Sequence, residues 1–557
     1  MSQAKGKKRQ LKKLWQFLLL LGFALSIVLG GYGLYRTYPN STVSASNSGG
    51  TCGSPSGGIT DNPIATRYGR SAYPWSDRIR WQCVYHIDDF AGNTPAEQFV
   101  AARDAAARDG GGVVYFPSGT YEFDDDLFLK NGVVIRGETP TATIDAKDGR
   151  YAPPTKFIFP QYRPQLSGRG TPNDTAFKKI TTLDPDGDRN IGIVNIDLDR
   201  AAISLLGDID AGEQQNIIVF GTRSNNVAQP DPKVPDLSFQ EPWMRYSYRF
   251  AANIKINAAR NILVANNRIN DAITDNYDQP GYRIKSLEGN AEITYRDGRK
   301  VPFHYGNHYG IVLNRSKQDG FEKAATPQTE PGLFRSGIVV RDNWVYHTMR
   351  VAISASGDGL VVRDNQIADE PNKQWWTDPT GTKEARGSVT LENRAIDWSG
   401  WNVEIEGNRY QVYRHKIRDT GYLSVDGEGI LIQECCGGTT VRGALIAENV
   451  GNSYIGLYKV RDIRDAIVRD NQVNGNPTNT ESIYVVADTN ANPYRMENVT
   501  IENNQITGGI LVKASAGGSN NRITNNRGDN SGAIEFSCHV TTQSNRGFQT
   551  APCLSES

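Results

Sequence analysis

The amino-acid sequence predicts an all-β chain folded as a right-handed parallel β-helix, with an N-terminal capping helix and a membrane-targeting segment ahead of it. Three observations lead to this prediction: short apolar pairs recur along the chain, Asn-rich turns separate them, and the later pairs follow one another at the spacing of single coils. A solenoid can extend through most of a 557-residue chain as one domain, because each repeat packs only on its neighbours. We therefore assign residues 61–557 to the β-helix.

The N-terminus carries a targeting signal. Residues 1–13 include six Lys or Arg side chains, and residues 14–35 are uncharged. Such a stretch is long enough to span a bilayer core of roughly 30 Å, and its basic flank should stay in the cytoplasm. The length favours an uncleaved signal anchor, and a signal peptide cleaved near residues 43–45 is the alternative. The β-helix is then extracytoplasmic, either membrane-anchored or secreted, with residues 36–60 as a flexible Ser/Gly-rich linker.

Charge and cysteine content narrow the class of partner. Lys+Arg and Asp+Glu both number 61, so the chain lacks the basic surplus typical of a nucleic-acid binder. Six cysteines in an exported chain permit disulfides, and buried free thiols are the alternative. Cys52–Cys83 and Cys538–Cys553 would fasten the two ends of the solenoid, and adjacent Cys435 and Cys436 would form a vicinal pair. The cysteine spacing predicts no zinc site, and we expect no resident metal or cofactor.

An N-terminal module is expected between residues 88 and 137. Residues 94–97 (TPAE) form a capping box with Pro at the first helical position, and the glycines at 110–112 end the helix. Two Val-rich strands follow, in VVYFPSGTY (113–121) and VVIRG (133–137). This order of motifs resembles the N-terminal cap and first coils of the pectate-lyase-like β-helix superfamily.

The resemblance implies a carbohydrate substrate and an activity among the hydrolases, lyases and epimerases of that superfamily. The sequence contains no paired-Asp block followed by Gly-His-Gly, as polygalacturonases have, and no Asp-Pro-His-Asp, as mannuronan epimerases have. The resemblance therefore extends to the fold and leaves the reaction open.

Two kinds of repeat support the solenoid beyond this module. One is a strand, an Asn-containing turn and a short strand; Asn tolerates left-handed turns and can stack in ladders. It occurs as NILVANNRI (261–269), GIVVRDNWV (337–345), GLVVRDNQI (359–367), DAIVRDNQV (465–473) and NVTIENNQI (498–506). The other is an apolar pair on one face of a strand, as in Ile254/Ile256, Ile311/Leu313, Val351/Ile353, Val389/Leu391, Ile430/Ile432, Ile455/Leu457, Ile483/Val485, Ile510/Val512 and Ile534/Phe536.

The spacing of these pairs predicts where inserted residues gather. From Ile430 onward the steps are 25, 28, 27 and 24 residues, whereas the steps from Ile311 to Ile430 are 40, 38 and 41, and the step from Ile254 to Ile311 is 57. Insertions in a solenoid map to loops on one face, often the binding face. We expect a cleft over the coils of residues 250–434 and regular coils over residues 435–557.

Five residues are candidates for catalysis. Asp426 and Glu428 lie between glycines at the expected mouth of a strand, where Gly lets the backbone approach a ligand closely, and Glu392 belongs to the preceding coil. Paired carboxylates are what glycoside hydrolysis requires. His308 is a candidate base, and Arg350 is a candidate cation for an acidic sugar. For each of them an ordinary structural role is the alternative.

Further residues are candidates for substrate binding. Aromatic side chains with a polar edge suit sugar stacking, and loop packing is the alternative role. The expected stacking also aligns Asn314, Ser354, Glu392 and Gln433 near the ends of successive strands. The binding candidates are Trp375, Trp376, Trp398, Trp401, Tyr305, Tyr309, Gln433 and Asn314.

The sequence leaves three hypotheses. In the first, the chain is a glycoside hydrolase that uses two of Asp426, Glu428 and Glu392. In the second, it is a polysaccharide lyase for a uronic-acid polymer, using Arg350 or His308 and, in that case, Ca²⁺. In the third, it is a non-catalytic surface module that binds polysaccharide. The hydrolase is favoured, because the carboxylates lie where the insertions converge. The sugar, its linkage and the oligomeric state stay open.

Overall fold

The computed structural model describes part of the chain. The described residues are 52, 60–140, 145–160, 178–183, 189–206, 215–227, 252–257, 260–270, 282–284, 292–295, 300–302, 309–314, 336–346, 351–368, 392–412, 415–416, 423–432, 440–458, 460, 462–474, 481–489, 492–493, 495–514 and 516–554. Residues 50–557 form one compact unit, apart from residues 1–49.

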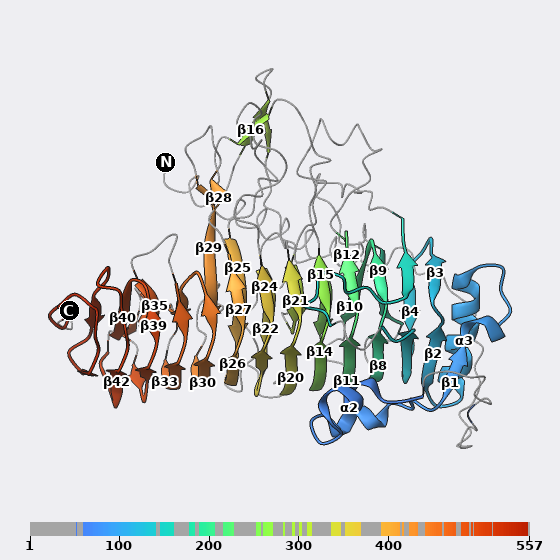
Figure 1. The fold of residues 1–557 in the computed structure, drawn as a ribbon, viewed down its shortest axis with the longest axis horizontal. Helices are drawn as coiled ribbons and strands as arrows, with labels where there is room; N and C mark the ends of the chain where they lie inside the picture. Colours follow the sequence, from blue (N-terminus) through green and yellow to red (C-terminus); the bar gives the residue numbers. More distant parts are fainter. Residues whose placement is uncertain are drawn as a thin grey trace, which may run out of the picture. The chain divides into compact units, whose positions relative to one another are not determined.

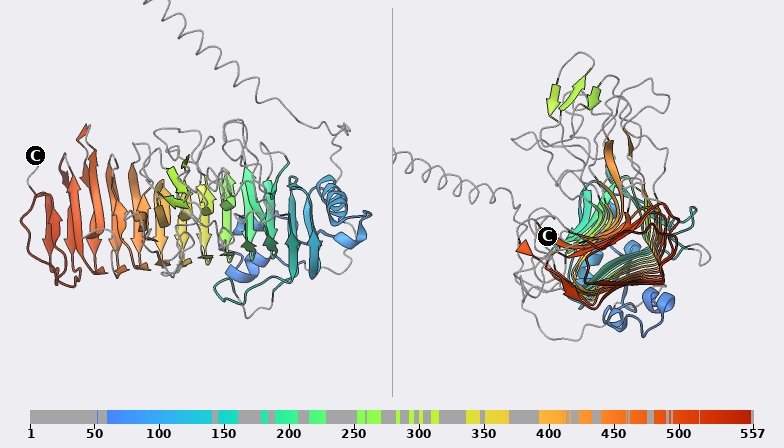
Figure 2. Two further views of the ribbon diagram at one scale, coloured as in Figure 1. Left: turned by 90° about the horizontal axis from the view of Figure 1, so that it is seen from above. Right: turned by 90° about the vertical axis from the view of Figure 1, so that its left-hand side faces the viewer.

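Short strands of successive coils stack into three parallel sheets, here called A, B and C, and each full coil contributes one strand to each sheet in that order (Figures 1 and 2). Sheet A contains β1 (Val84–His86), β2 (Gly112–Phe116), β5 (Val133–Gly137), β8 (Arg189–Val194), β11 (Gln215–Phe220), β14 (Arg260–Ala265), β20 (Ser336–Arg341), β23 (Val361–Arg363), β26 (Trp401–Glu406), β30 (Val441–Ala447), β33 (Ile463–Arg469), β37 (Met496–Glu497), β38 (Thr500–Glu502), β41 (Gly518–Ser519), β42 (Asn521–Thr524) and β44 (Val540–Gln543).

Sheet B contains β3 (Gly119–Glu122), β6 (Thr155–Ile158), β9 (Asp197–Asp199), β12 (Arg223–Asn225), β15 (Arg268–Asn270), β21 (Trp344–Tyr346), β24 (Gln366–Ala368), β27 (Arg409–Gln411), β31 (Val450–Gly451), β34 (Gln472–Val473) and β39 (Gln505–Ile506). Sheet C contains β4 (Leu127–Leu129), β7 (Lys178–Thr182), β10 (Ala201–Leu206), β13 (Ala252–Asn257), β19 (Tyr309–Leu313), β22 (Val351–Ser356), β25 (Glu392–Ser399), β29 (Leu423–Ile432), β32 (Ile455–Leu457), β35 (Glu481–Thr489), β40 (Gly509–Ala514) and β43 (Ile534–Phe536). Two short strands, β28 (His415–Lys416) and β36 (Asn492–Pro493), pair antiparallel with β29 and β35, and β16 (Tyr282–Ile284), β17 (Glu292–Tyr295) and β18 (Lys300–Pro302) form a small antiparallel sheet. The predicted parallel β-helix is confirmed.

Helix α3 (Pro95–Arg108) covers the first coil, as predicted from the capping box. The Thr94 hydroxyl accepts a hydrogen bond from the backbone N–H of Glu97, and the Glu97 carboxylate accepts one from the N–H of Asn93 at 2.6 Å. Two glycines with positive φ, Gly110 and Gly111, then turn the chain into β2. A side chain at Gly111 would lie 2.7 Å from the Gly132 carbonyl oxygen, so only glycine lets these two turns meet.

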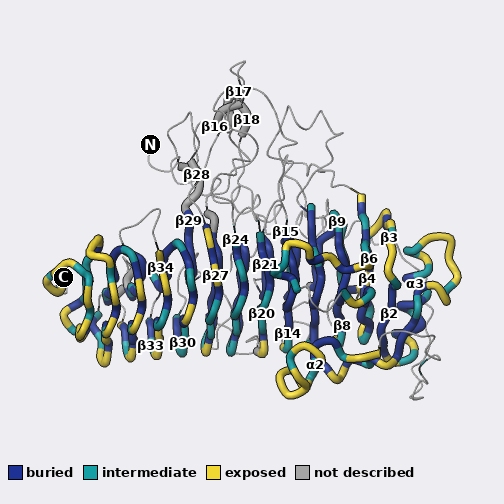
Figure 3. The backbone as a smooth tube through the Cα atoms, viewed as in Figure 1, coloured by how far each residue is buried: buried dark blue, intermediate teal, exposed yellow. Residues whose placement is uncertain are grey.

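The strands of the three sheets are largely buried (Figure 3), and one column of isoleucines holds sheet C in register within the core. Each of these side chains pairs with the equivalent position of the next coil, and all but the last are completely buried. The column consists of Ile180, Ile203, Ile254, Ile311, Ile353, Ile396, Ile430, Ile455, Ile483, Ile510 and Ile534. Burying such a side chain contributes about 1.5 to 3 kcal/mol, so the column is a major source of stability.

The turn from sheet A to sheet B is built on a ladder of buried asparagines, as the repeats predict. In each turn of the ladder a residue with positive φ, such as Asp364 or Gly407, precedes the ladder Asn. Each Asn donates its side-chain N–H to the next Asn and to a backbone carbonyl, for example Asn408 to Asn449 at 3.0 Å and to Val362 at 2.9 Å. The ladder runs through Asn267, Asn343, Asn365, Asn408, Asn449, Asn471, Asn504, Asn526 and Asn545.

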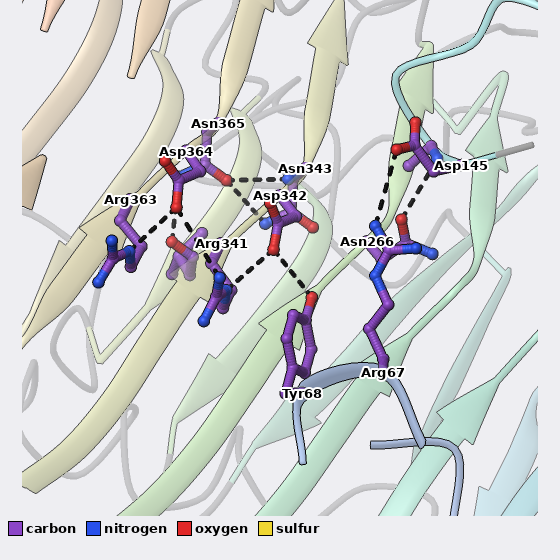
Figure 4. A network of polar contacts seen from close by, with 12 residues as sticks. Arg67, Tyr68, Asp145, Asn266, Arg341, Asp342, Asn343, Arg363, Asp364 and Asn365 are labelled. Atoms are coloured by element: carbon purple, nitrogen blue, oxygen red, sulfur yellow. Dashed lines mark hydrogen bonds and ion pairs between the residues drawn. The ribbon is translucent and has the colours of Figure 1, made fainter. Parts of the chain in front are cut away.

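An N-terminal strap, residues 60–82, crosses the outer face of sheet A. It contains α2 (Pro63–Tyr68) and a 3-10 turn (Pro74–Arg78), and its apolar side chains pack on outward-facing residues of that sheet. Tyr68 donates a hydrogen bond to Asp342 at 3.0 Å, and Arg67 pairs with Asp145 at 3.6 Å (Figure 4). The strap therefore ties residues near the start of the chain to the middle coils.

The register of sheet C corrects two predicted strand positions. Ile353 pairs with Ile311, so Val351 lies two residues away from its expected place, in a small apolar cluster separate from the main core. The next coil uses Ile396 in place of the expected pair Val389/Leu391, a pair that lies outside the described residues. The first of these shifts is two residues, and the second, from Val389 to Ile396, is seven. The steps after Ile254 are therefore 57, 42, 43 and 34 residues before the bare coils begin.

The disulfides Cys52–Cys83 and Cys538–Cys553 form as predicted, one at each end of the solenoid. Cys435 and Cys436 lie outside the described residues. Among the residues that the structure describes, no helix is both long and apolar enough to cross a membrane. The predicted membrane-targeting segment, residues 14–35, lies outside them and stays a prediction.

Candidate functional site

Long connections border sheet C on both sides. The turn from β23 to β24, between sheets A and B, takes only residues 364–365. By contrast, residues 369–391 lead into β25 and residues 315–335 lead out of β19. Strand β29, extended by its antiparallel partner β28, projects beyond its neighbours (Figure 1). Loops on a rigid scaffold commonly carry function, so the outer face of sheet C is the place to look for a site.

A buried charged cluster lies where β25, β29 and β32 meet. Its members are Arg394, Asp397, Glu428 and Tyr454, with 6, 2, 7 and 4% of their surface exposed. The Arg394 guanidinium donates a hydrogen bond to Glu428 and lies 3.8 Å from an Asp397 carboxylate oxygen. The Tyr454 hydroxyl donates to the other Glu428 oxygen at 3.1 Å. One guanidinium thus joins two carboxylates of neighbouring coils.

The register explains why these side chains meet. Arg394 pairs directly with Glu428 across the strands, two residues before the isoleucine column. Ala395 and Ile396 both belong to the main core, so Arg394 before them and Asp397 after them lie outside it. Ser354 is the register neighbour of Asp397 on β22; its buried hydroxyl has no hydrogen-bond partner among the described residues. Burying charged side chains costs free energy unless they are paired, so this buried cluster is a candidate functional site.

The electrostatics give the protonation state of the phenol in this cluster. Burial, followed by the charge of the Glu428 carboxylate, raises the pKa of Tyr454 far above its ordinary value, so this phenol stays protonated. Glu428 receives one hydrogen bond from this neutral phenol and one from a cation. Both donors suit an ionised carboxylate, which is the form that acts as a base or nucleophile.

Aromatic residues continue the outer face toward the C-terminus. The rings of Tyr454 and Tyr484 meet edge to face with their centroids 5.5 Å apart, and the rings of Tyr458 and Tyr484 lie 6.4 Å apart. The Tyr484 hydroxyl donates to the Glu481 carboxylate at 2.5 Å. Burial and Glu481 raise the pKa of Tyr484.

The predicted catalytic residues have different outcomes. Glu428 lies in the charged cluster. Asp426 and Glu392 face each other in the backbone register of β29 and β25, and their side chains lie outside the described part. Arg350 and His308 fall outside the described residues.

One glycine beside this pair, Gly429, has a role different from the predicted one. A side chain at Gly429 would lie 2.4 Å from the Tyr454 carbonyl oxygen, so this glycine admits the backbone of the next coil and not a ligand. Glu428 belongs to the middle of a strand, β29, and not to the mouth of one.

The predicted binding residues that the structure describes lie mostly away from a ligand face. Trp398 and Tyr309 are completely buried, the first in the main core, so neither ring offers a face to a sugar. Asn314 is 1% exposed and turns the corner after β19 with φ 56°. Trp401 stacks on Arg442 at 4.6 Å on sheet A. The remaining candidates, Trp375, Trp376, Tyr305 and Gln433, lie outside the described residues.

Sequence reasoning missed Arg394, Asp397 and Tyr454. The signal that points to the first two is the order of residues around Ile396, where charged side chains stand two residues before and one after it. Within the described part of the chain, no group of three or more His, Cys, Asp or Glu side chains is placed to hold a metal ion.

Comparisons with known proteins found similar solved structures but no matching family. A scan against protein-family models found no match, and neither did a search of curated proteins. Solved structures resemble this chain at low identity. PfbA, a surface adhesin of Streptococcus pneumoniae, is 15% identical over 84% of this chain and 91% of that chain, with a TM-score of 0.42. The A-module of the mannuronan C-5 epimerase AlgE6 of Azotobacter vinelandii is 14% identical over 84% and 99%, with a TM-score of 0.34. DFA-IIIase of Arthrobacter chlorophenolicus A6 is 9% identical over 84% and 93%, with a TM-score of 0.36. Function must therefore be argued from the site.

Proposed function

We propose that this chain is an extracytoplasmic enzyme that binds a polysaccharide on the outer face of sheet C and hydrolyses its glycosidic bonds. The observation that carries the proposal is the buried cluster in which one guanidinium, Arg394, contacts the carboxylates Asp397 and Glu428. Because both carboxylates touch the same group, they are no farther apart than the carboxyl pairs of glycoside hydrolases, roughly 5 to 9.5 Å.

The chemistry divides between the two carboxylates. Glu428, held by a cation and a phenol, is the ionised member that attacks the anomeric carbon or activates a water molecule. Asp397 is the member that donates a proton to the leaving oxygen. Asp426 and Glu392, paired in the backbone two residues earlier on the same strands, are the alternative partners for Glu428.

The test measures products and variants together. The full-length protein is incubated with neutral and acidic polysaccharides, while reducing ends and ultraviolet absorbance are followed. New reducing ends without absorbance are expected, and Glu428→Gln and Asp397→Asn should each abolish them. Glu404→Gln is the matched control, because Glu404 is an outward carboxylate of sheet A, 3.7 Å from Arg363.

Two outcomes would replace the proposal. Absorbing products indicate elimination, since a lyase leaves a conjugated double bond; attention then moves to Arg350 and His308, and a calcium requirement has to be tested. Binding without any product indicates a non-catalytic surface module. Full activity of Glu428→Gln would remove this residue from the mechanism.

A further inference from the structure

A lane of outward-facing positions leads from the charged cluster toward the C-terminus. In the register of sheet C, Asp397 pairs with Leu431, Leu431 with Gly456, and Gly456 with Tyr484. These positions belong to four successive coils. Since neighbouring strands lie about 4.8 Å apart, the lane is about 14 Å long. Asp397 and Leu431 are buried, so the accessible part of the lane consists of the half-buried residues at its C-terminal end.

The glycine in this lane makes room for an aromatic ring. A side chain at Gly456 would lie 2.6 Å from the Leu431 side chain and 2.9 Å from the ring of Tyr458. Tyr458 therefore lies against the strand at the place where other coils carry an outward side chain. With Tyr484 beside it, the lane presents two half-buried rings between Leu431 and the next coil.

Carboxylates border this aromatic surface. Glu428 accepts from the hydroxyl of Tyr454, and Glu481 accepts from that of Tyr484. Carboxylates accept several hydrogen bonds at once, so each can also receive the hydroxyl of a sugar. Among the contacts described above, Arg394 is the cation nearest to the lane. Its guanidinium already contacts two carboxylates.

We propose that this lane binds the sugar chain on the C-terminal side of the bond to be cleaved, with neutral sugar rings stacked on Tyr458 and Tyr484 and the chain parallel to the solenoid axis. The inference rests on the proposed function and adds a substrate class to it. Aromatic faces with bordering acceptors suit rings that carry hydroxyl groups. A uronate ring would place a further carboxylate beside Glu428 and Glu481, and like charges at such a distance repel.

The experiment separates the lane from the chemistry. Neutral oligosaccharides of increasing length, made from the polymer that the protein degrades, are tested with Tyr484→Ala, Tyr458→Ala and the control Tyr346→Ala, a half-buried tyrosine of sheet B. The lane variants should raise KM for long substrates about fivefold to tenfold more than KM for the shortest substrate. The control should leave every length unchanged.

A binding measurement makes the inference testable without turnover. Calorimetry with the Glu428→Gln protein compares neutral and uronic-acid oligosaccharides of equal length. Weaker binding of long neutral chains after Tyr484→Ala supports the lane even if no polymer is cleaved. Equal length dependence in Tyr484→Ala and Tyr346→Ala would overturn the lane and leave the proposed hydrolysis standing. Tighter binding of uronic-acid chains would overturn the substrate class.

Discussion

Replacing Arg394 by Met is the perturbation with the largest calculable effect. The substitution keeps the length of the side chain and removes the charge that faces Glu428 and Asp397, both less than 10% exposed. Breaking a buried ion pair by removing one partner costs about 3 to 5 kcal/mol, because a charge is left without compensation. We expect Arg394→Met to lose this amount of unfolding free energy.

The triple variant Arg394→Met, Asp397→Leu, Glu428→Leu tests what the cluster is for. Replacing a buried ionic triad by apolar side chains of similar volume is often neutral, or stabilising by about 1 to 4 kcal/mol. We therefore expect the triple variant to be at least as stable as the wild type and to have no activity. If the triple variant is stable but inactive, the charged residues are needed for activity and not for folding.

Urea unfolding followed by circular dichroism measures the stability, and release of reducing ends measures the activity. The control is Arg363→Met on the outer face of sheet A, whose partners Asp364, Glu404 and Glu406 lie 3.0, 3.7 and 3.5 Å away with 21 to 37% of each partner side chain exposed. An exposed pair contributes at most about 1 kcal/mol. A loss below that value in Arg394→Met would refute the reasoning, since the cluster would then be solvated; activity in the triple variant would refute the site.

Three further predictions concern the scaffold. Asn408→Leu should lose about 3 kcal/mol or more of unfolding free energy in urea, because it removes the hydrogen bonds to Val362 and Asn449; an unchanged midpoint would contradict the ladder. Burial alone would raise the pKa of Asp342, but Arg341 and its other partners hold it below its ordinary value. Its stabilisation is therefore present above about pH 4 and lost as the pH falls through the lowered pKa, so the stability gap between wild type and Asp342→Asn should close on acidification. Replacing Cys538 and Cys553 together by Ser should cost about 3 kcal/mol, as expected for a disulfide separated by 15 residues, and should raise hydrogen exchange in the last coil.

The sequence was sufficient for those parts of the fold that depend on local chemistry. The capping box at Thr94 and the Asn that follows a left-handed residue are short-range signals, and each has the predicted role. Spacing between apolar pairs was reliable where coils carry no insertion, as from Ile430 to Ile455. The long middle steps gave no such check, because an insertion of any length fits between two strands.

Only part of the charged cluster was predicted, because the long middle steps left the register of β25 unchecked. Glu428 was found because glycines surround it, although Gly429 admits the next coil and not a ligand. Arg394 and Asp397 were missed because the coil was anchored on Val389 and not on Ile396, so Trp398 was taken for a sugar-binding residue when it fills the core.

In a solenoid, the strand register therefore determines which charged residues of neighbouring coils come into contact and form a site. Arg394 on β25 and Glu428 on β29 are far apart in sequence, and the strand register that pairs Ile396 with Ile430 brings them into contact. Anchoring this coil on Val389 in place of Ile396 shifts the assignment by seven residues, about 23 Å along a strand, and an odd shift also exchanges the two faces. That displacement exceeds the reach of an ion pair. Consequently, any catalytic assignment on this fold depends on identifying the core column first, and the Arg394 variants test that column and the chemistry built on it at once.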